Sequence, residues 1–199
     1  MYICSMNNPL RNLALLGSSL TSLLMILIGG MLPSAILGLS ENFSFHIVDL
    51  PSSWQIPALL LSGMVYGPSS GIIAVFAYLT IGLFYLPVFH GGGSIGYIAT
   101  PDFGYLVGFI PAVWITGRIV QTAKRKTLLA LFISAVCGLT IIHSIGIINI
   151  IFGSLVSRWQ QGVVELLLTY SISTFPIQIL LCPAIVLIAK SLRKIQLLE

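Results

Sequence analysis

The sequence predicts an all-α integral membrane protein, a bundle of six transmembrane helices with an external ligand cavity covered by loops. Of the 199 residues, 57% are hydrophobic and only 7% are charged, whereas soluble domains carry about 25% charged residues. This composition cannot cover a surface that faces water, so we expect one membrane domain, residues 1–199. A glycine-rich break between apolar segments, residues 82–105, predicts the cavity.

Six apolar segments approach the length needed to cross a bilayer, roughly 17–25 residues. The first is longer than the apolar core of a signal peptide, about 7–15 residues, and is therefore interpreted as a transmembrane helix. Gly67 and Pro68 separate the second helix, which is short, from the third. Pro176 and Pro183 predict a kink in the last helix. The predicted helices are 12–37, 52–66, 69–86, 103–121, 128–152 and 162–190.

The basic residues test this helix count. Six spans place both termini on one side of the membrane, and eight of the nine basic residues lie on that side. Because cytoplasmic loops are enriched in Lys and Arg, we expect cytoplasmic termini in a multi-pass protein of the plasma (inner) membrane. The small net charge of +4 reflects this topology, and no nucleic-acid partner is expected. The eight residues are Arg11, Arg118, Lys124, Arg125, Lys126, Lys190, Arg193 and Lys194.

With this orientation, the segment 82–105 lies on the external side. Irregular backbone at membrane depth is tolerated only where protein buries it or where it lines a cavity. Glycines there either form a flexible turn or let the backbone approach a ligand and offer its N–H groups. The aromatic residues either line the ligand site or belong to an interfacial belt. The expected ligand contacts in this segment are Phe89, Gly91, Gly92, Gly93, Tyr97 and Tyr105.

Polar and small residues inside the apolar helices carry further predictions. Asn149 and Gln178 are costly in lipid unless partnered, so they either contact a neutral polar ligand or join helices by hydrogen bonds. Ala14, Ser18 and Ser22 recur at every fourth position of the first helix. This spacing allows close approach of another helix, either within the bundle or from a separate membrane subunit.

The motifs of several enzyme classes are missing from the sequence. It contains no HExxH, GxSxG or Walker A pattern. The three cysteines have no CxxC spacing, which disfavours a metal site or a disulfide framework. The only candidates for intramembrane catalysis are His143 and Ser144, and they stand alone, without a recognisable set of catalytic partners. We therefore expect neither an enzyme nor a cofactor.

The stretch from Gly67 to Phe109 closely resembles the signature of the BioY family, the biotin-binding S components of energy-coupling factor (ECF) transporters. Shared features include Leu86-Pro87-Val88-Phe89, the Gly91–Gly93 run and Gly104-Tyr105-Leu106. The resemblance implies a non-catalytic subunit that binds biotin from outside and works with a transmembrane T component and two ATPase subunits. The small-residue face that begins at Ala14 resembles the alanine motif with which S components dock.

The last helix departs from the family pattern, which usually reads Pro-Gly-Asp-x-x-Lys. In this chain Gln178 replaces the acid and Leu181 replaces the lysine. Losing both charges together is physically coherent, because a lone buried charge would be penalised. A ligand carboxylate would then meet the N–H groups of Gly91–Gly93 or the side chain of Arg158. The alternatives are an S component for another small vitamin or biotin precursor, and a solitary facilitator.

Overall fold

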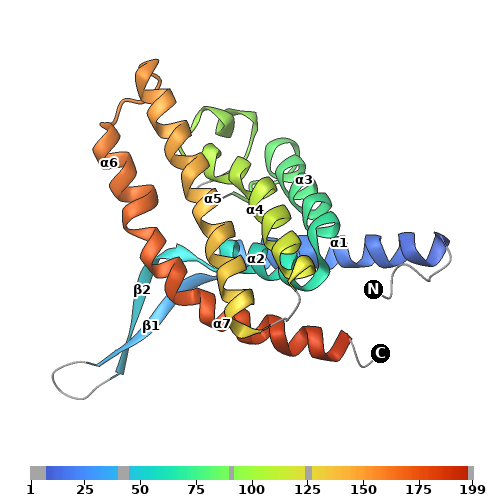
Figure 1. Cartoon of the computed structure of the whole chain (residues 1–199). Coiled ribbons are helices and arrows are strands. Elements are labelled where there is room, and N and C mark those ends of the chain that lie inside the picture. Colours follow the sequence, from blue (N-terminus) through green and yellow to red (C-terminus); the bar gives the residue numbers. More distant parts are fainter. Residues whose placement is uncertain (1–7, 40–44, 90–91, 124–126, 197–199) are drawn as a thin grey trace.

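The computed structural model describes residues 8–39, 45–89, 92–123 and 127–196. Figure 1 shows a helical bundle with a β-hairpin at one side. The elements, in chain order, are α1 (Asn8–Met31), β1 (Pro33–Leu39), β2 (Phe45–Ser53), α2 (Gln55–Tyr66), α3 (Pro68–Phe84), η2 (Ile95–Ala99), α4 (Phe103–Thr122), α5 (Leu128–Leu155), α6 (Val163–Leu167), η3 (Leu168–Ile172) and α7 (Thr174–Gln196).

The helices have the lengths and surfaces of a membrane protein. Within the described residues, four are long and apolar enough to cross a membrane: Pro9–Met31, Phe103–Thr122, Leu128–Leu155 and Val163–Lys194. Two shorter helices, α2 and α3, are also apolar. Large apolar side chains also cover the outside of the bundle, which water would not tolerate over such an area. Examples are Leu20, Phe76, Ile148, Leu180 and Leu187.

The hairpin corrects two predictions. The helix expected over 12–37 ends at Met31. The chain is mostly helical, as expected, but β1 pairs with β2 in an antiparallel sheet that the all-α prediction did not include. Pro33 supplies the physical reason, since proline disfavours a helical conformation in the residue before it and lacks the N–H that would continue a helix. The pairing places Ala35 opposite Asp49, with an irregularity between Pro33 and Ala35.

Helices lie at the other predicted positions: α2, α3, α4 and α5 begin and end within three residues of the predicted bounds. The last predicted helix, 162–190, is irregular and continues to Gln196. Between α6 and α7 lies a π-helical turn, η3, in which the Ser173 N–H donates to the Leu168 carbonyl, five residues back, at 3.1 Å. This turn comes just before Pro176, which cannot donate a backbone hydrogen bond. Figure 1 shows the end of α7 running in a different direction from α6.

Glycines bring α4 and α5 close together. A Cβ on Gly108 would lie 3.0 Å from Cα of Ile142, and one on Gly104 would lie 2.8 Å from Cγ of Asn149. Small residues four apart let two helix backbones approach in lipid, where packing rather than water drives association. The close contact places Tyr105 of α4 beside His143 of α5, with ring centroids 5.6 Å apart.

Candidate ligand-binding site

A cavity of about 500 Å³ lies between the hairpin and the helices. Small-molecule sites commonly measure about 300–1,000 Å³. Its wall draws on the end of α1, the hairpin, α2, α4, α5 and the last helix, with apolar side chains such as Leu106 and Phe109 between the polar ones. Its principal polar side chains are those of Gln55, Tyr97, Asp102, Tyr105, His143 and Gln178.

A chain of hydrogen bonds runs along one wall of the cavity. The Tyr105 hydroxyl lies 2.5 Å from Oγ of Ser171, and that Oγ lies 3.3 Å from Nδ1 of His143. Nε2 of His143 lies 2.9 Å from Oε1 of Gln178, whose Nε2 donates to Oγ of Ser52 at 3.4 Å. The chain therefore connects α4, η3, α5, α7 and the hairpin through buried polar groups, which must be hydrogen-bonded to be tolerated.

A second polar group lies where η2 leads into α4. The Tyr97 hydroxyl donates to Oδ2 of Asp102 at 2.8 Å. Burial of Tyr97, followed by the nearby charge of Asp102, raises the pKa of the Tyr97 hydroxyl above its usual value. Tyr97 is therefore a stable proton donor, and Asp102 brings a carboxylate to the cavity wall.

Three of the predicted ligand contacts meet at this cavity. Tyr97, Tyr105 and Gln178 all line it, although they come from η2, α4 and α7. The fold thus brings together residues that are up to about 80 positions apart in the chain. Gln178 also joins two helices, because its Oε1 bonds His143 on α5.

The other predicted contacts lie away from the cavity lining. Phe89 is buried over Gly82, where a Cβ would come within 2.7 Å of Cε2 of the ring, and it forms an edge contact with Tyr78. Its backbone exchanges hydrogen bonds with Gly92, whose φ of +136° favours glycine. A Cβ on Gly93 would lie 2.6 Å from Cα of Pro87. These contacts pack Phe89 and Gly93 against Gly82 and Pro87.

Two further predicted residues, Asn149 and Arg158, have defined contacts. Nδ2 of Asn149 donates to the Pro101 carbonyl at 3.0 Å, which ties α5 to the start of α4. Arg158 donates to the Ile98 carbonyl at 2.9 Å, and its guanidinium lies 5.1 Å from the ring centroid of Trp159. Gly91 lies outside the described residues.

The small residues of α1 face different ways. Ser22 is fully buried, and Oγ of Ser18 lies 2.7 Å from Oγ of Ser70 on α3. Ala14 is exposed. Ser18 and Ser22 therefore pack within the bundle in this conformation, as one of the two interpretations of the stripe expected.

The sequence did not predict most of the cavity wall, and the polar residues that it did not assign to the ligand site include His143, Asp102, Gln55 and Ser52. A signal existed for His143, because an ionisable residue in the middle of an apolar helix is by default a candidate functional residue. Ser52 gave no signal, since its place depends on the unpredicted hairpin. Within the described chain, no group of three His, Cys, Asp or Glu residues is arranged to hold a metal ion.

The fold and the cavity define a class, that of helical membrane proteins with a cavity of small-molecule size. A model of the BioY family matches residues 10–197, and the chain therefore belongs to the BioY family.

Individual relatives agree with this assignment. The "Probable biotin transporter BioY" of Lysinibacillus sphaericus is 34% identical over 98 residues, 49% of this chain and 50% of the relative. The "Biotin transporter BioY" of Rhodobacter capsulatus is 34% identical over 103 residues, 50% and 54% of the two chains. The chain thus matches about half the length of these curated relatives.

A solved structure shares the fold over nearly the full length. It is the crystal structure of "the S-component for biotin from an ECF-type ABC transporter", with a TM-score of 0.72 over 96% of this chain and 95% of that one. Because the sequence identity is 23%, this structural similarity shows a shared fold and no more than that.

Proposed function

We propose that this chain is the substrate-binding membrane subunit for biotin uptake and has no catalytic activity of its own. The observation that carries the proposal is the cavity of about 500 Å³, in which Tyr97, Tyr105 and Gln178 meet. Such a mixture of apolar wall and a few polar groups suits a small amphipathic ligand. Membership of the BioY family and the names of the relatives, which are biotin transporters, support biotin as that ligand.

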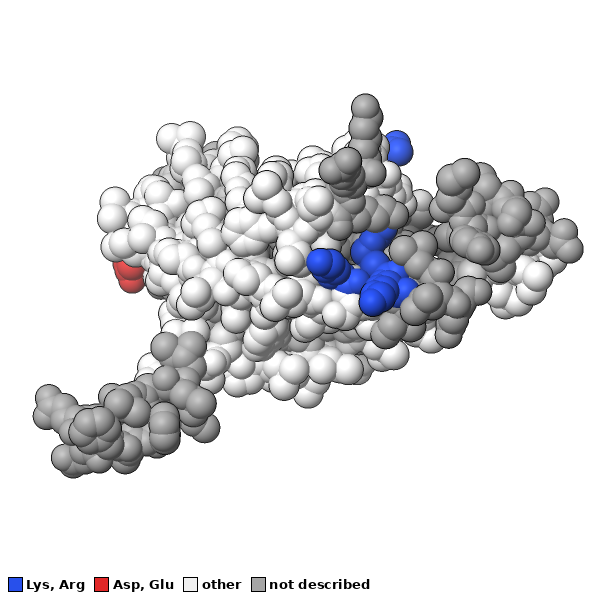
Figure 2. Space-filling view, turned by 60° about the horizontal axis from the view of Figure 1, so that its bottom comes forward, with Lys and Arg blue, Asp and Glu red and all other residues white. Residues whose placement is uncertain are grey.

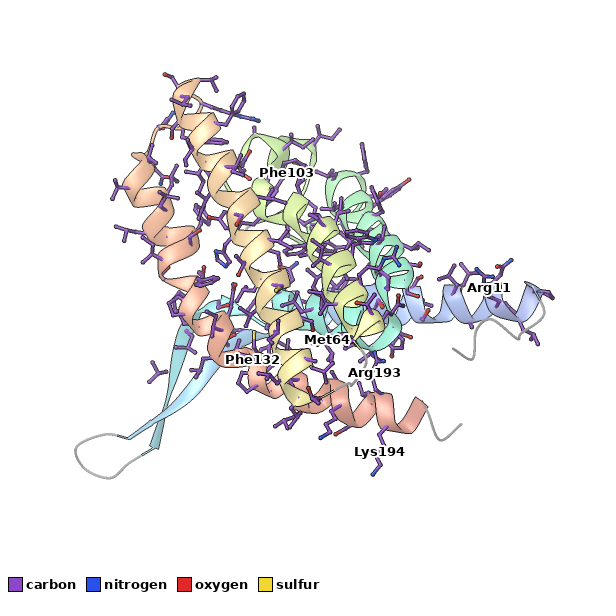
Figure 3. All side chains as sticks on the ribbon, viewed as in Figure 1. Arg11, Met64, Phe103, Phe132, Arg193 and Lys194 are labelled. Atoms are coloured by element: carbon purple, nitrogen blue, oxygen red, sulfur yellow. The ribbon has the colours of Figure 1, made fainter. Side chains whose placement is uncertain are left out.

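The six main helices, including the short α2 and α3, all cross the membrane in this proposal, and the cavity opens outward. Figure 3 supports one orientation for the bundle: Phe103, at the start of α4, lies at one end, while Arg193 and Lys194, near the end of α7, lie at the other. Figure 2 shows Lys and Arg gathered on one face. Under the positive-inside rule this face and both termini are cytoplasmic, in the plasma membrane.

The described residues of this region, Phe89 and 92–102, then serve as the external lid. Tyr97 and Asp102 reach the cavity wall from this segment, and the bridge between Phe89 and Gly92 together with the Ser94 N–H bond to the Gly82 carbonyl, 3.1 Å, stiffens it. Phe89, Gly92, Gly93 and Asn149 also belong to the proposed ligand site, where they support the cavity wall. Gly91 remains proposed from the sequence.

We further propose that the subunit works with an ECF T component and two ATPase subunits, which supply the energy for transport. The docking face lies on α1, where Ala14 is exposed together with Leu13 and Leu16. Ser18 and Ser22 would join it only if α1 moved away from α3, because both now pack inward.

A second candidate is an S component for a biotin precursor or another small vitamin. The specific observation in its favour is the neutral pair at 178 and 181, where the family pattern carries charge. Titration of the purified protein with biotin, desthiobiotin and thiamine separates the candidates. The proposal expects saturable biotin binding at micromolar concentrations or below, and tighter binding of another ligand would contradict it. Co-purification with a T component tests the partner.

A further inference from the structure

A second cavity, of about 420 Å³, lies between α5 and the start of α7. It opens on the outer surface of the bundle, since Thr140, Ser144 and Ile172 in its lining are exposed. We call it the lateral groove. One side is lined by Thr140, Ser144 and Ile147 of α5, and the other by Ile172, Phe175 and Pro176.

The local sequence explains why the groove exists. Thr140 and Ser144 are four residues apart, so their small side chains lie on the same face of α5. On the other side, the π-helical turn η3 adds a residue to the helical turn before Pro176. Small side chains opposite a widened turn leave space that larger side chains would fill.

The polar side chains that line the groove already have hydrogen-bond partners. The Ser144 hydroxyl donates to the Thr140 carbonyl, and the Thr140 hydroxyl donates to the Val136 carbonyl, both at 2.8 Å. His143 also lines the groove, and both of its ring nitrogens are bonded within the bundle. A polar ligand would lose its own hydrogen bonds on entering such a site, whereas a hydrocarbon chain would not.

The groove lies in the surface that faces the hydrocarbon of the membrane. Its α5 residues are near the middle of a 28-residue helix that is long and apolar enough to cross a bilayer. The neighbouring Ile148 and Leu168 are exposed. Figure 1 shows α1, which carries the proposed docking face, on the opposite side of the bundle from α6. The position therefore favours a lipid over a partner subunit as the occupant.

We infer that the lateral groove binds one acyl chain of a bilayer phospholipid. The chain would pack against Phe175, whose ring lies 4.9 Å, between centroids, from the ring of His143. Because His143 also lines the ligand cavity, the lipid chain supports from outside a wall whose inner face belongs to that cavity. The inference is independent of which ligand the cavity holds.

The test is photolabelling of the full chain in dioleoyl phosphatidylcholine vesicles that contain a phosphatidylcholine with a diazirine at the middle of one acyl chain. Mass spectrometry then locates the adducts. A chain held in the groove should label the half-buried Ile147 and Phe175 about threefold more strongly than Ile148 and Leu180, which are 65% and 66% exposed. Labelling that simply follows exposure would overturn the inference.

Variants that fill the groove make the test specific. Ser144→Phe should reduce labelling of Phe175 by about tenfold, and Thr140→Leu should reduce it in the same direction. Ile148→Phe is the matched control, because it adds the same ring to α5 outside the groove and should leave Phe175 labelling unchanged. Unchanged labelling in folded Ser144→Phe and Thr140→Leu proteins would refute the assignment.

Two further arms identify the occupant. A phosphatidylglycerol probe with the same chain should give the same pattern, since a groove at mid-depth contacts chains and not headgroups. Labelling by the phosphatidylglycerol probe alone would assign it to the basic face and overturn the inference. Saturating biotin should leave the pattern unchanged, and loss of the Ile147 and Phe175 adducts would show instead that the groove belongs to the ligand site.

Discussion

Gly146 of α5 makes room for the Tyr105 ring, and the substitution Gly146→Ala tests the architecture of the site. A Cβ at this position would lie 2.5 Å from Cδ1 of Tyr105 and closer still to Cε1 and Cζ. Ordinary carbon–carbon contacts are about 3.5–4.0 Å, so the ring must move by about 1 Å. Its hydroxyl, now 2.5 Å from Oγ of Ser171, would then lie beyond good hydrogen-bonding distance.

The competing effects can be compared. Overpacking a core costs about 1–3 kcal/mol, and the lost hydrogen bond adds about 1 kcal/mol. Replacing a helical glycine by alanine returns about 1 kcal/mol. The steric effect wins, and we expect Gly146→Ala to lower the free energy of unfolding by about 1–3 kcal/mol. Since Tyr105 lines the cavity, biotin affinity should fall by about tenfold.

The assay is thermal unfolding in detergent together with biotin titration, with Gly17→Ala as the control. Gly17 is also helical, but a Cβ there meets nothing within 4 Å. The control should keep its affinity and unfold no earlier than wild type. If Gly146→Ala behaves like Gly17→Ala in both assays, Tyr105 does not pack over position 146 and the reasoning is refuted.

Three other substitutions separate structural from ligand-binding roles. Asn149→Leu should lower the free energy of unfolding by about 1–2 kcal/mol through loss of the bond to the Pro101 carbonyl; a large fall in biotin affinity, with stability unchanged, would show instead that Asn149 touches the ligand. Arg193→Met should cost about 1.5–3 kcal/mol, because the guanidinium bonds the Met64 carbonyl near the end of α2 (Figure 3). The exposed Lys190→Met is its control on the same helix, and equal unfolding temperatures would contradict the prediction. Tyr97→Phe removes the donor to Asp102, and its effect on unfolding should be constant from about pH 6 to 9, because tyrosine ordinarily ionises near 10 and the pKa of Tyr97 is raised. Above that range the unfolded chain loses the Tyr97 proton first, so the stabilisation by Tyr97 should decrease as pH rises; a decrease already near neutral pH would argue against the raised pKa.

Much of the helical framework could be predicted because bilayer thickness sets the length of a spanning helix. The start of α4 was predicted at Phe103, and α5 begins at Leu128 as expected. The hairpin could not be read from hydropathy, since Ala-Ile-Leu after Pro33 is as apolar as the helix before it. Pro33 was the available signal for the end of the helix, but the prediction followed the apolar residues on both sides of it and continued the helix to residue 37.

The site was predicted only in part, for a related reason. Whether a polar residue faces the ligand or another helix depends on rotation about the helix axis, which a single sequence does not fix. Gln178 faces the cavity, whereas Asn149 bonds the backbone at Pro101. The glycine-rich segment identified the family, but its Phe89 is packed under the wall and does not line it.

The most direct test is an experimental structure of the protein saturated with biotin. The account predicts biotin in the cavity, in contact with Tyr97, Tyr105 and Gln178. Biotin bound elsewhere on the protein, or absent from the cavity at saturating concentration, would contradict it.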